Sequence, residues 1–130
     1  MEKNTLLHRQ VNPSFVQAEC VSSQVFSVTS QTFKPTPKDN LKLSVYNGEK
    51  YTAEDSFAHF KTQGYQSAGV LSLEVSECDN ESLPVVEDNH PFDGHTYVDF
   101  NALTNSAIEK KAKKLKKYAL DRGWQHSPIK

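Results

Sequence analysis

The sequence predicts an α+β fold: a mostly antiparallel sheet of about five strands, with two helices at about residues 53–63 and 106–122. Segments of strand-favouring composition follow one another before the first helical pattern, so strands and helices do not alternate regularly. Both helical segments have a capping side chain before them and a glycine after them. The expected order is β-β-β-α-β-β-α, with both helices on one face of the sheet. Residues 1–130 are expected to form one domain with a sizeable core.

The N-terminal part of the chain is interpreted as strands joined by turns. Leu6–Gln10 is a plausible short strand that ends before Asn12-Pro13, a turn signal. Cys20–Phe33 is rich in Val, Thr, Ser and Phe, which favours one bent strand or two successive strands. Two prolines predict a loop over residues 34–40. The alternation of apolar and polar residues over 41–46 predicts a half-buried strand after that loop.

The first helix is expected to follow a tight turn. Asn47-Gly48 indicates either a hairpin into residues 49–51 or a turn toward the helix. Thr52 can cap this helix, and Gly64 can end it. The inward face of the helix is expected to carry Ala53, Phe57 and Phe60.

A buried strand, an acidic loop and a further strand are expected next. Residues 68–75, AGVLSLEV, form a nearly continuous apolar run. Residues 77–94 contain six carboxylates and two prolines, which argue against a regular helix there. Residues 95–100 alternate again, which predicts a strand with two different faces. Thr96, Val98 and Phe100 are expected on one face, and His95, Tyr97 and Asp99 on the other.

The last helix, Asn105–Arg122, has the clearest signals in the chain. Ser106 and Glu109 match a capping box, and Gly123 is placed to end the helix. A narrow apolar stripe is formed by Ile108, Ala112, Leu115 and Ala119. Six lysines lie off this stripe: Lys110, Lys111, Lys113, Lys114, Lys116 and Lys117.

The charge of the chain is strongly asymmetric. Residues 1–100 contain 7 Lys/Arg and 14 Asp/Glu, a net charge of −7, whereas residues 101–130 contain 8 and 2, a net charge of +6. The lysine face can therefore bind phosphate groups of a nucleic acid, or it can be a solvated face balanced by the protein's own carboxylates. Membrane binding is disfavoured because the apolar stripe holds no aromatic residue. The candidate binding lysines are Lys110, Lys113, Lys114 and Lys117.

Four residues are candidates for catalysis: His8, Arg9, His95 and Asp99. The planar guanidinium of Arg9 can hold a phosphate or carboxylate, or can form a salt bridge with a local acid. His95 can act as a general base if Asp93 or Asp99 orients it, or can belong to an ordinary polar surface.

The sequence indicates no metal site and no cofactor. Cys20 and Cys78 are far apart without a CxxC motif, and both are expected to be reduced. Cys78 lies between Glu77 and Asp79, whose charges raise the pKa of the thiol and make it a poor nucleophile.

The loop before residue 41 offers a second candidate for recognition. Lys34, Lys38 and Asp39 lie on a backbone stiffened by proline, which suits either binding or a rigid connection. The sequence has no apolar run of the roughly 18 residues that a membrane span requires. Its first ten residues contain no apolar core of a signal peptide, which indicates a cytoplasmic protein.

Several segments resemble small uncharacterised bacterial proteins: LLHRQVNPSF, SQTFKPTPKDNLKLSVYNG, the Glu77–Pro84 stretch, VDF and RGWQ. The resemblance implies a bacterial, cytoplasmic protein and carries no activity or ligand. Our first hypothesis is a non-enzymatic accessory protein that binds a protein partner through a sheet edge, the proline-containing loop or the acidic loop. The alternatives are a nucleic-acid-binding module that uses the basic helix, and a small hydrolase or transferase with a His/Arg site.

Overall fold

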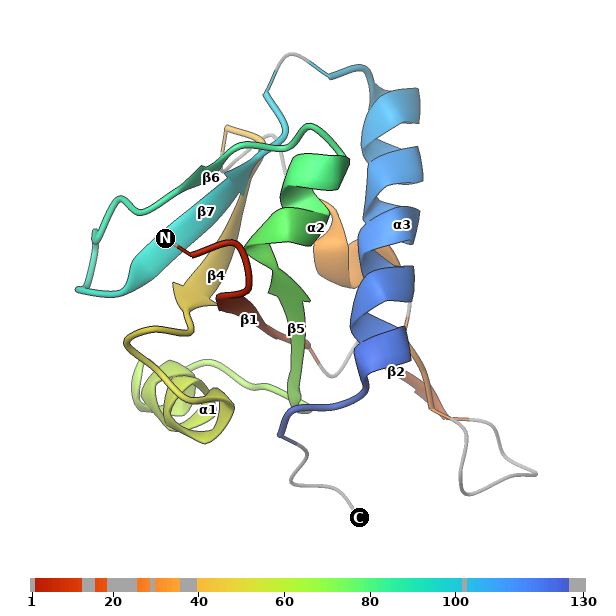
Figure 1. The fold of residues 1–130 in the computed structure, drawn as a ribbon. Coiled ribbons are helices and arrows are strands. Elements are labelled where there is room, and N and C mark those ends of the chain that lie inside the picture. The colour runs from red at the N-terminus through yellow and green to blue at the C-terminus, as the bar shows by residue number, and fades with distance from the viewer. Residues whose placement is uncertain are drawn as a thin grey trace.

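The computed structural model describes residues 2–12, 16–18, 26–28, 30–35, 40–101 and 103–126. Within these residues the main sheet has five strands in the order β5-β1-β4-β7-β6, and all neighbouring strands are antiparallel (Figure 1). The strands are β1 (Leu6–Gln10), β4 (Lys42–Asn47), β5 (Val70–Glu74), β6 (Val85–Val86) and β7 (His95–Asp99). A separate antiparallel pair joins β2 (Val16–Ala18) and β3 (Phe26–Val28).

The described helices are α1 (Ala53–Thr62), α2 (Val75–Asn80), α3 (Asn105–Arg122) and the short 3₁₀ helix η2 (Ser30–Phe33). The α+β fold and the two long helices predicted from the sequence are thus confirmed. None of the helices described is long and apolar enough to span a membrane.

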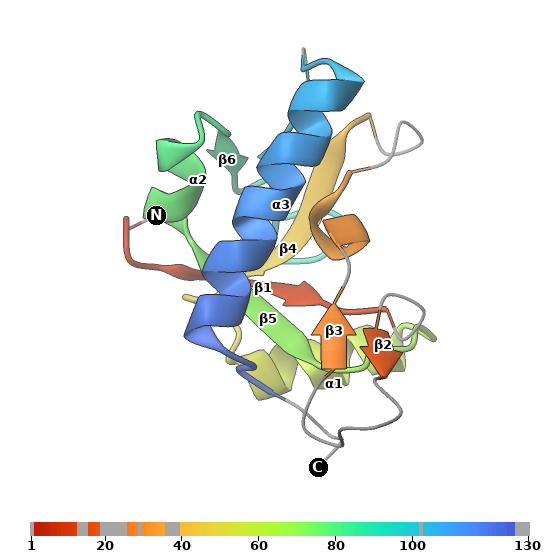
Figure 2. The same ribbon diagram turned by 90° about the vertical axis from the view of Figure 1, so that its right-hand side faces the viewer.

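The main core lies between the sheet and α3. The apolar stripe of α3 is fully buried, and it packs with Leu7 of β1, Leu73 of β5 and Val98 of β7. Phe33 of η2 completes this core from the side. Figure 2 shows α3 in front of the sheet with η2 beside it.

Helix α1 lies on the opposite face of the sheet, so the expectation that both helices share one face is wrong. Adjacent residues of a strand point to opposite faces, and α1 contacts the residues that alternate with the core residues. Gln10 Nε2 donates to Ser56 Oγ at 2.9 Å, and the Tyr46 hydroxyl lies 2.9 Å from His59 Nδ1. Ser56 is the fully buried residue of α1, whereas Phe57 and Phe60 are half-buried. The polar residues of β1 and β4 therefore determine the position of α1.

Helix α2 was not predicted, because the sequence favoured a loop from residue 77 onward. Glu74 caps this helix, and the Glu77 side chain accepts from the Glu74 backbone N–H at 2.7 Å, which completes a capping box. Val75 and Cys78 point into the core. The prediction failed because six residues are too few to show helical periodicity. The first proline of the segment, Pro84, follows the helix and precedes β6.

The start of α3 also differs in detail from the prediction. Thr104, not Ser106, caps the helix, and its side chain accepts from the Ala107 N–H at 3.1 Å. Glu109 forms an ion pair with Lys34 at 3.2 Å. The apolar stripe and the end at Gly123 are as predicted, and Gly123 has a φ of 93°.

The Asn47-Gly48 turn leads into α1 and not into a hairpin, since β4 pairs with β1 and β7. Gly48 N donates to Leu6 O at 2.8 Å, and a Cβ at Gly48 would lie 2.3 Å from that oxygen. Only glycine permits this close approach.

The outer edge of β5 is covered by the segment that follows α3. Val70 N donates to His126 O at 2.8 Å, and Gln125 N donates to Val70 O at 2.9 Å. Trp124 packs against the core beside Gly69, where an added Cβ would come within 2.8 Å of the indole ring. Both outward main-chain groups of Val70 at this edge are therefore bonded within the chain.

Candidate functional site

A cleft of about 510 Å³ opens on the α1 face of the sheet. Its floor is formed by β1, β4 and the first residue of β7. One wall is the end of α1 with the following turn, and the other wall is the segment before β7. Its lining includes the aromatic or apolar residues Val45, Tyr46, Phe60, Tyr65, Pro91 and Phe92. We call it the aromatic cleft.

Ring contacts hold the walls of the aromatic cleft in place. Phe60 and Tyr65 are stacked with their ring centroids 5.0 Å apart, and Tyr46 and Phe92 are also 5.0 Å apart. Tyr46 is buried, and burial raises the pKa of its phenol, so the hydroxyl stays protonated beside His59. Tyr65 is 61% exposed. Ring contacts and a hydrogen bond thus fix Tyr46 in the floor of the cleft, and the wall that carries Tyr65 is exposed to solvent.

Two glycines shape the segments that carry these rings. Gly64, with a φ of 91°, reverses the chain after α1 and returns Tyr65 onto Phe60. Gly94, with a φ of 99°, lies in the loop that folds back over β7. In that loop Asn89 N donates to His95 O at 3.0 Å, and His95 N donates to Phe92 O at 3.1 Å.

His95 lines the aromatic cleft and is oriented by Asp88, with 2.6 Å between Nδ1 and Oδ1. The sequence suggested Asp93 or Asp99 for this role. Instead, Asp93 forms an ion pair with Lys50 at 2.5 Å, and Asp99 Oδ1 accepts from Asn101 N at 2.7 Å. None of the described residues forms a hydrogen bond with His95 Nε2.

His8 lies outside the aromatic cleft and is fully engaged in hydrogen bonds. Its Nε2 lies 3.0 Å from the Tyr51 carbonyl oxygen, which can only accept, so Nε2 carries the hydrogen. Nδ1 then accepts from the Ser72 hydroxyl at 2.7 Å. Burial lowers the pKa of His8. This histidine is a neutral structural group that joins β1 to β5 and to the turn that precedes α1.

Arg9 reaches the aromatic cleft but holds the backbone together. The β1–β4 pairing stops at His8 and Tyr46. Beyond this point Arg9 Nε donates to Thr32 O at 2.8 Å, and Nη1 donates to Ser44 O at 2.9 Å. Of the four catalytic candidates, the structure brings Arg9 and His95 to one cleft and places His8 and Asp99 outside it.

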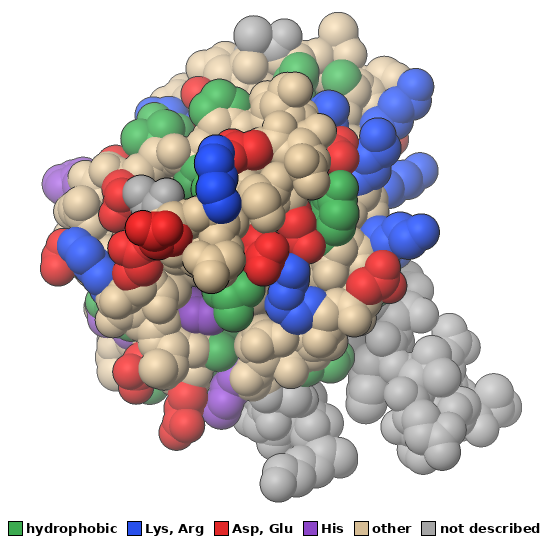
Figure 3. Space-filling view, in the orientation of Figure 1, with side chains coloured by type: hydrophobic (Ala, Val, Ile, Leu, Met, Phe, Trp, Pro, Cys, Tyr) green, Lys and Arg blue, Asp and Glu red, His purple; other side chains and the backbone are tan. Residues whose placement is uncertain are grey.

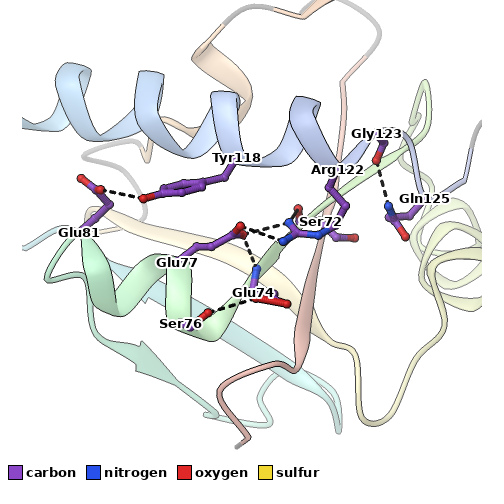
Figure 4. A network of polar contacts seen from close by, with 9 residues as sticks. All are labelled: Ser72, Glu74, Ser76, Glu77, Glu81, Tyr118, Arg122, Gly123 and Gln125. Atoms are coloured by element: carbon purple, nitrogen blue, oxygen red, sulfur yellow. Dashed lines mark hydrogen bonds and ion pairs between the residues drawn. The ribbon is translucent and has the colours of Figure 1, made fainter.

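The lysines of α3 fall into two groups. Lys111 and Lys114 each lie 3.5 Å from Oε1 of Glu81, a residue whose side chain is only 8% exposed. The Tyr118 hydroxyl also donates to Glu81, at 3.4 Å (Figure 4). Lys110, Lys113, Lys116 and Lys117 form no ion pair with any residue that the structure describes.

The same figure shows a second link between α2 and α3. Arg122 donates from both terminal nitrogens to the carboxylate of Glu77, at 3.0 and 2.8 Å, and also to Ser72 O at 2.9 Å (Figure 4). Such a bidentate pair fixes geometry as well as charge. This pair therefore joins the first turn of α2 to the last turn of α3. The lysine face of α3 lies on the outer surface of the molecule.

The remaining candidates are placed as follows. Lys34 is engaged with Glu109, whereas Lys38, Asp39 and Cys20 lie outside the described residues. Cys78 is buried, and burial together with nearby carboxylates raises the pKa of its thiol to about 12, which makes it a poor nucleophile. Among the described residues, no three His, Cys, Asp or Glu side chains are grouped so that they could hold a metal ion.

Sequence reasoning missed most of the aromatic cleft. The sequence predicted Tyr46 on a strand. It did not predict that Tyr46 contacts α1, because α1 was expected on the same face of the sheet as α3. Phe92 and Asp88 lay within a segment interpreted only as an acidic loop. Comparison with models of protein families, with curated proteins and with solved structures gave no match. The interpretation of the site therefore depends on its geometry.

Proposed function

We propose that this is a non-enzymatic accessory protein that binds a segment of a partner protein in the aromatic cleft. The observation that carries the proposal is Tyr65, a large ring that is 61% exposed and stacked on Phe60 at the mouth of the cleft. Aromatic residues are concentrated at the energetic centres of protein interfaces. A ring held rigid by a neighbour also loses little conformational entropy on binding.

The cleft favours an extended segment with one apolar or aromatic anchor. Its volume of about 510 Å³ falls within the range typical of binding pockets. Asp88 and Asp93 flank the Pro91–Phe92 wall. They pair with His95 and Lys50 within the protein, and the Asp93 side chain remains 78% exposed, so it is still open to a further cation. Because opposite charges across an interface increase association rate and specificity, we expect Lys or Arg beside the anchor of the partner.

The hydrogen bonding of the other candidates supports binding over catalysis. Both ring nitrogens of His8 are engaged, and two donors of Arg9 are bound to backbone carbonyls. His95 has an orienting carboxylate, but no hydroxyl or thiol among the described residues is hydrogen-bonded to its Nε2 as a nucleophile would be.

The location also favours the cleft over a sheet edge. The β5 edge is paired with the segment after α3, and the β6 strand is two residues long. Short or covered edges offer little main-chain pairing to a partner strand.

Selection of 12-residue peptides from a phage-displayed library tests the proposal. The wild-type protein is the target, and the Tyr65→Ala variant serves for counter-selection. Peptides that share an aromatic or large apolar residue flanked by Lys or Arg are expected. The enriched peptide should lose about tenfold or more in affinity for Tyr65→Ala, as measured by fluorescence anisotropy.

The matched control is Tyr97→Ala, which removes a half-buried tyrosine ring on β7, outside the cleft. Circular dichroism checks that both variants are folded. The proposal fails if no shared pattern is enriched, or if Tyr65→Ala binds the selected peptides as tightly as the wild type.

A further inference from the structure

Four lysines of α3 form one straight row on its outer surface. Lys110, Lys113, Lys114 and Lys117 lie at i, i+3, i+4 and i+7, a spacing that places them on one face of a helix. At 1.5 Å per residue the row extends about 10 Å along the helix axis. We call it the lysine stripe. It lies opposite the buried apolar stripe, and in Figure 3 lysine side chains project from the side of the molecule that α3 occupies.

The protein's own carboxylates balance only part of this charge. The acidic residues of α3 are Glu109 and Asp121, and Glu109 is already paired with Lys34. Glu81 approaches from the inner side and contacts Lys111 and Lys114. Lys110, Lys113 and Lys117 have no ion pair among the described residues. Direct ion pairs among the described residues therefore engage two of the six lysines of the helix.

We infer that the lysine stripe binds the phosphate backbone of a double-stranded nucleic acid. A duplex carries one negative charge per about 1.7 Å of its axis, so the length of the stripe matches about six phosphate charges. Lysine ammonium groups hold phosphates as point charges. The stripe contains no Arg, Asn or Gln that would read base edges, which indicates binding that does not depend on sequence.

The surroundings of the stripe argue against two other anionic partners. A helix that lies on a membrane inserts an apolar face, but the apolar stripe of α3 is at most 2% exposed because it is packed against the sheet, and the one large apolar residue that α3 exposes is Leu120, at 36%. The centre of a protein interface is enriched in aromatic residues and depleted of lysine. The stripe has the opposite composition, so a phosphate backbone fits it better than an acidic protein.

Fluorescence anisotropy with a labelled 20-base-pair DNA duplex tests this inference. The wild-type protein is expected to bind at about 50 mM salt, and the plot of log affinity against log salt should have a slope of about −3 to −4 for four contacts. The triple variant Lys110→Glu/Lys113→Glu/Lys117→Glu should lose at least about tenfold in affinity and flatten the slope. Binding should not change with the sequence of the duplex.

A control with the same change in net charge separates the stripe from general electrostatics. Lys42→Glu/Lys50→Glu/Lys61→Glu changes three lysines outside α3. It should retain affinity within about threefold of the wild type, since long-range charges are screened at this salt concentration. Circular dichroism confirms the fold of both variants.

Three results would overturn the inference. One is the absence of duplex binding by the wild-type protein at 50 mM salt. Another is an equal loss of affinity in the stripe variant and in its control. The third is equal or tighter binding to vesicles containing phosphatidylserine or to a polyglutamate peptide, which would indicate a membrane or an acidic protein instead.

Discussion

Hydrogen bonds between polar residues attach α1 to the sheet. Ser72, His8, Tyr46 and His95 are successive partners across four strands on the α1 face. The first three are buried, and each of these three has a hydrogen-bond partner. Burial of a polar group costs free energy unless the group is hydrogen-bonded. This face of the sheet is therefore specified by matched donors and acceptors, which makes it sensitive to a change in protonation.

His8 should make the stability of the fold dependent on pH. Burial lowers the pKa of His8 in the folded state below its ordinary value near 6.5. The unfolded chain then binds a proton that the folded chain does not, so the free energy of unfolding falls as the pH drops below about 6.5, by at most about 1.4 kcal/mol per unit. The loss ends at the folded pKa. Urea titrations of the wild type and of His8→Gln at pH 7.5, 6.5 and 5.5 measure this effect.

The difference between the two proteins isolates His8 from the other titrating groups. The His8→Gln variant is expected to be less stable than the wild type at pH 7.5, with the gap narrowing toward pH 5.5. A gap that stays constant over this range would contradict the assignment of His8 as a buried neutral group.

His95 shows the limit of sequence reasoning about single residues. The sequence identified it as a candidate and placed it on the correct face of its strand. It could not identify Asp88 as its partner, because the two residues meet only when residues 88–95 fold back on themselves. Spacing along a chain determines contacts within a helix or strand, but the contacts of a loop depend on its particular turns.

At the scale of elements, the periodicity of apolar residues predicted the long elements and missed the short ones. Helix α3 spans eighteen residues, and its apolar stripe is buried as expected. Helix α2, with six residues, and β6, with two, are too short for any period to be recognised. The sequence also could not predict the face of the sheet on which α1 packs. The buried residue of α1 is Ser56, which is hydrogen-bonded to Gln10, and not a phenylalanine.

The cap of α3 offers a direct test, because two hydroxyl residues compete for it in the sequence. Thr104 accepts a hydrogen bond from the Ala107 N–H, whereas Ser106 lies inside the first turn and is exposed. Thr104→Ala should lower the free energy of unfolding by about 1 kcal/mol. Ser106→Ala, the matched control, should change it by less than about 0.5 kcal/mol. Urea titration gives both values. A larger loss of stability in Ser106→Ala than in Thr104→Ala would show that Ser106 is the cap, as the sequence predicted.

Across the whole molecule, the sheet separates two surfaces of different chemistry. Helices α1 and α3 lie on opposite faces of the sheet (Figures 1 and 2). The aromatic cleft opens on the α1 face, and the lysine stripe points outward from α3. Neither proposal needs the other, since the two surfaces share no residue. Together the two proposals would make the protein an adaptor that holds a protein segment and a nucleic acid at the same time.

The integrity of the whole sheet depends on the segment after α3, because it covers the β5 edge. A chain that ends at Gly123 loses the two backbone hydrogen bonds to Val70 and the half-buried Trp124. We expect its free energy of unfolding to fall by about 2 kcal/mol or more. The uncovered β5 edge should then pair between molecules. Sedimentation velocity should show association that increases with concentration and exceeds that of the full chain.

A chain ending at His126 is the matched control, since it keeps Trp124 and both hydrogen bonds, and it should behave as the full chain does. If the two truncated chains are equally stable and associate equally, the covering segment does not protect the edge.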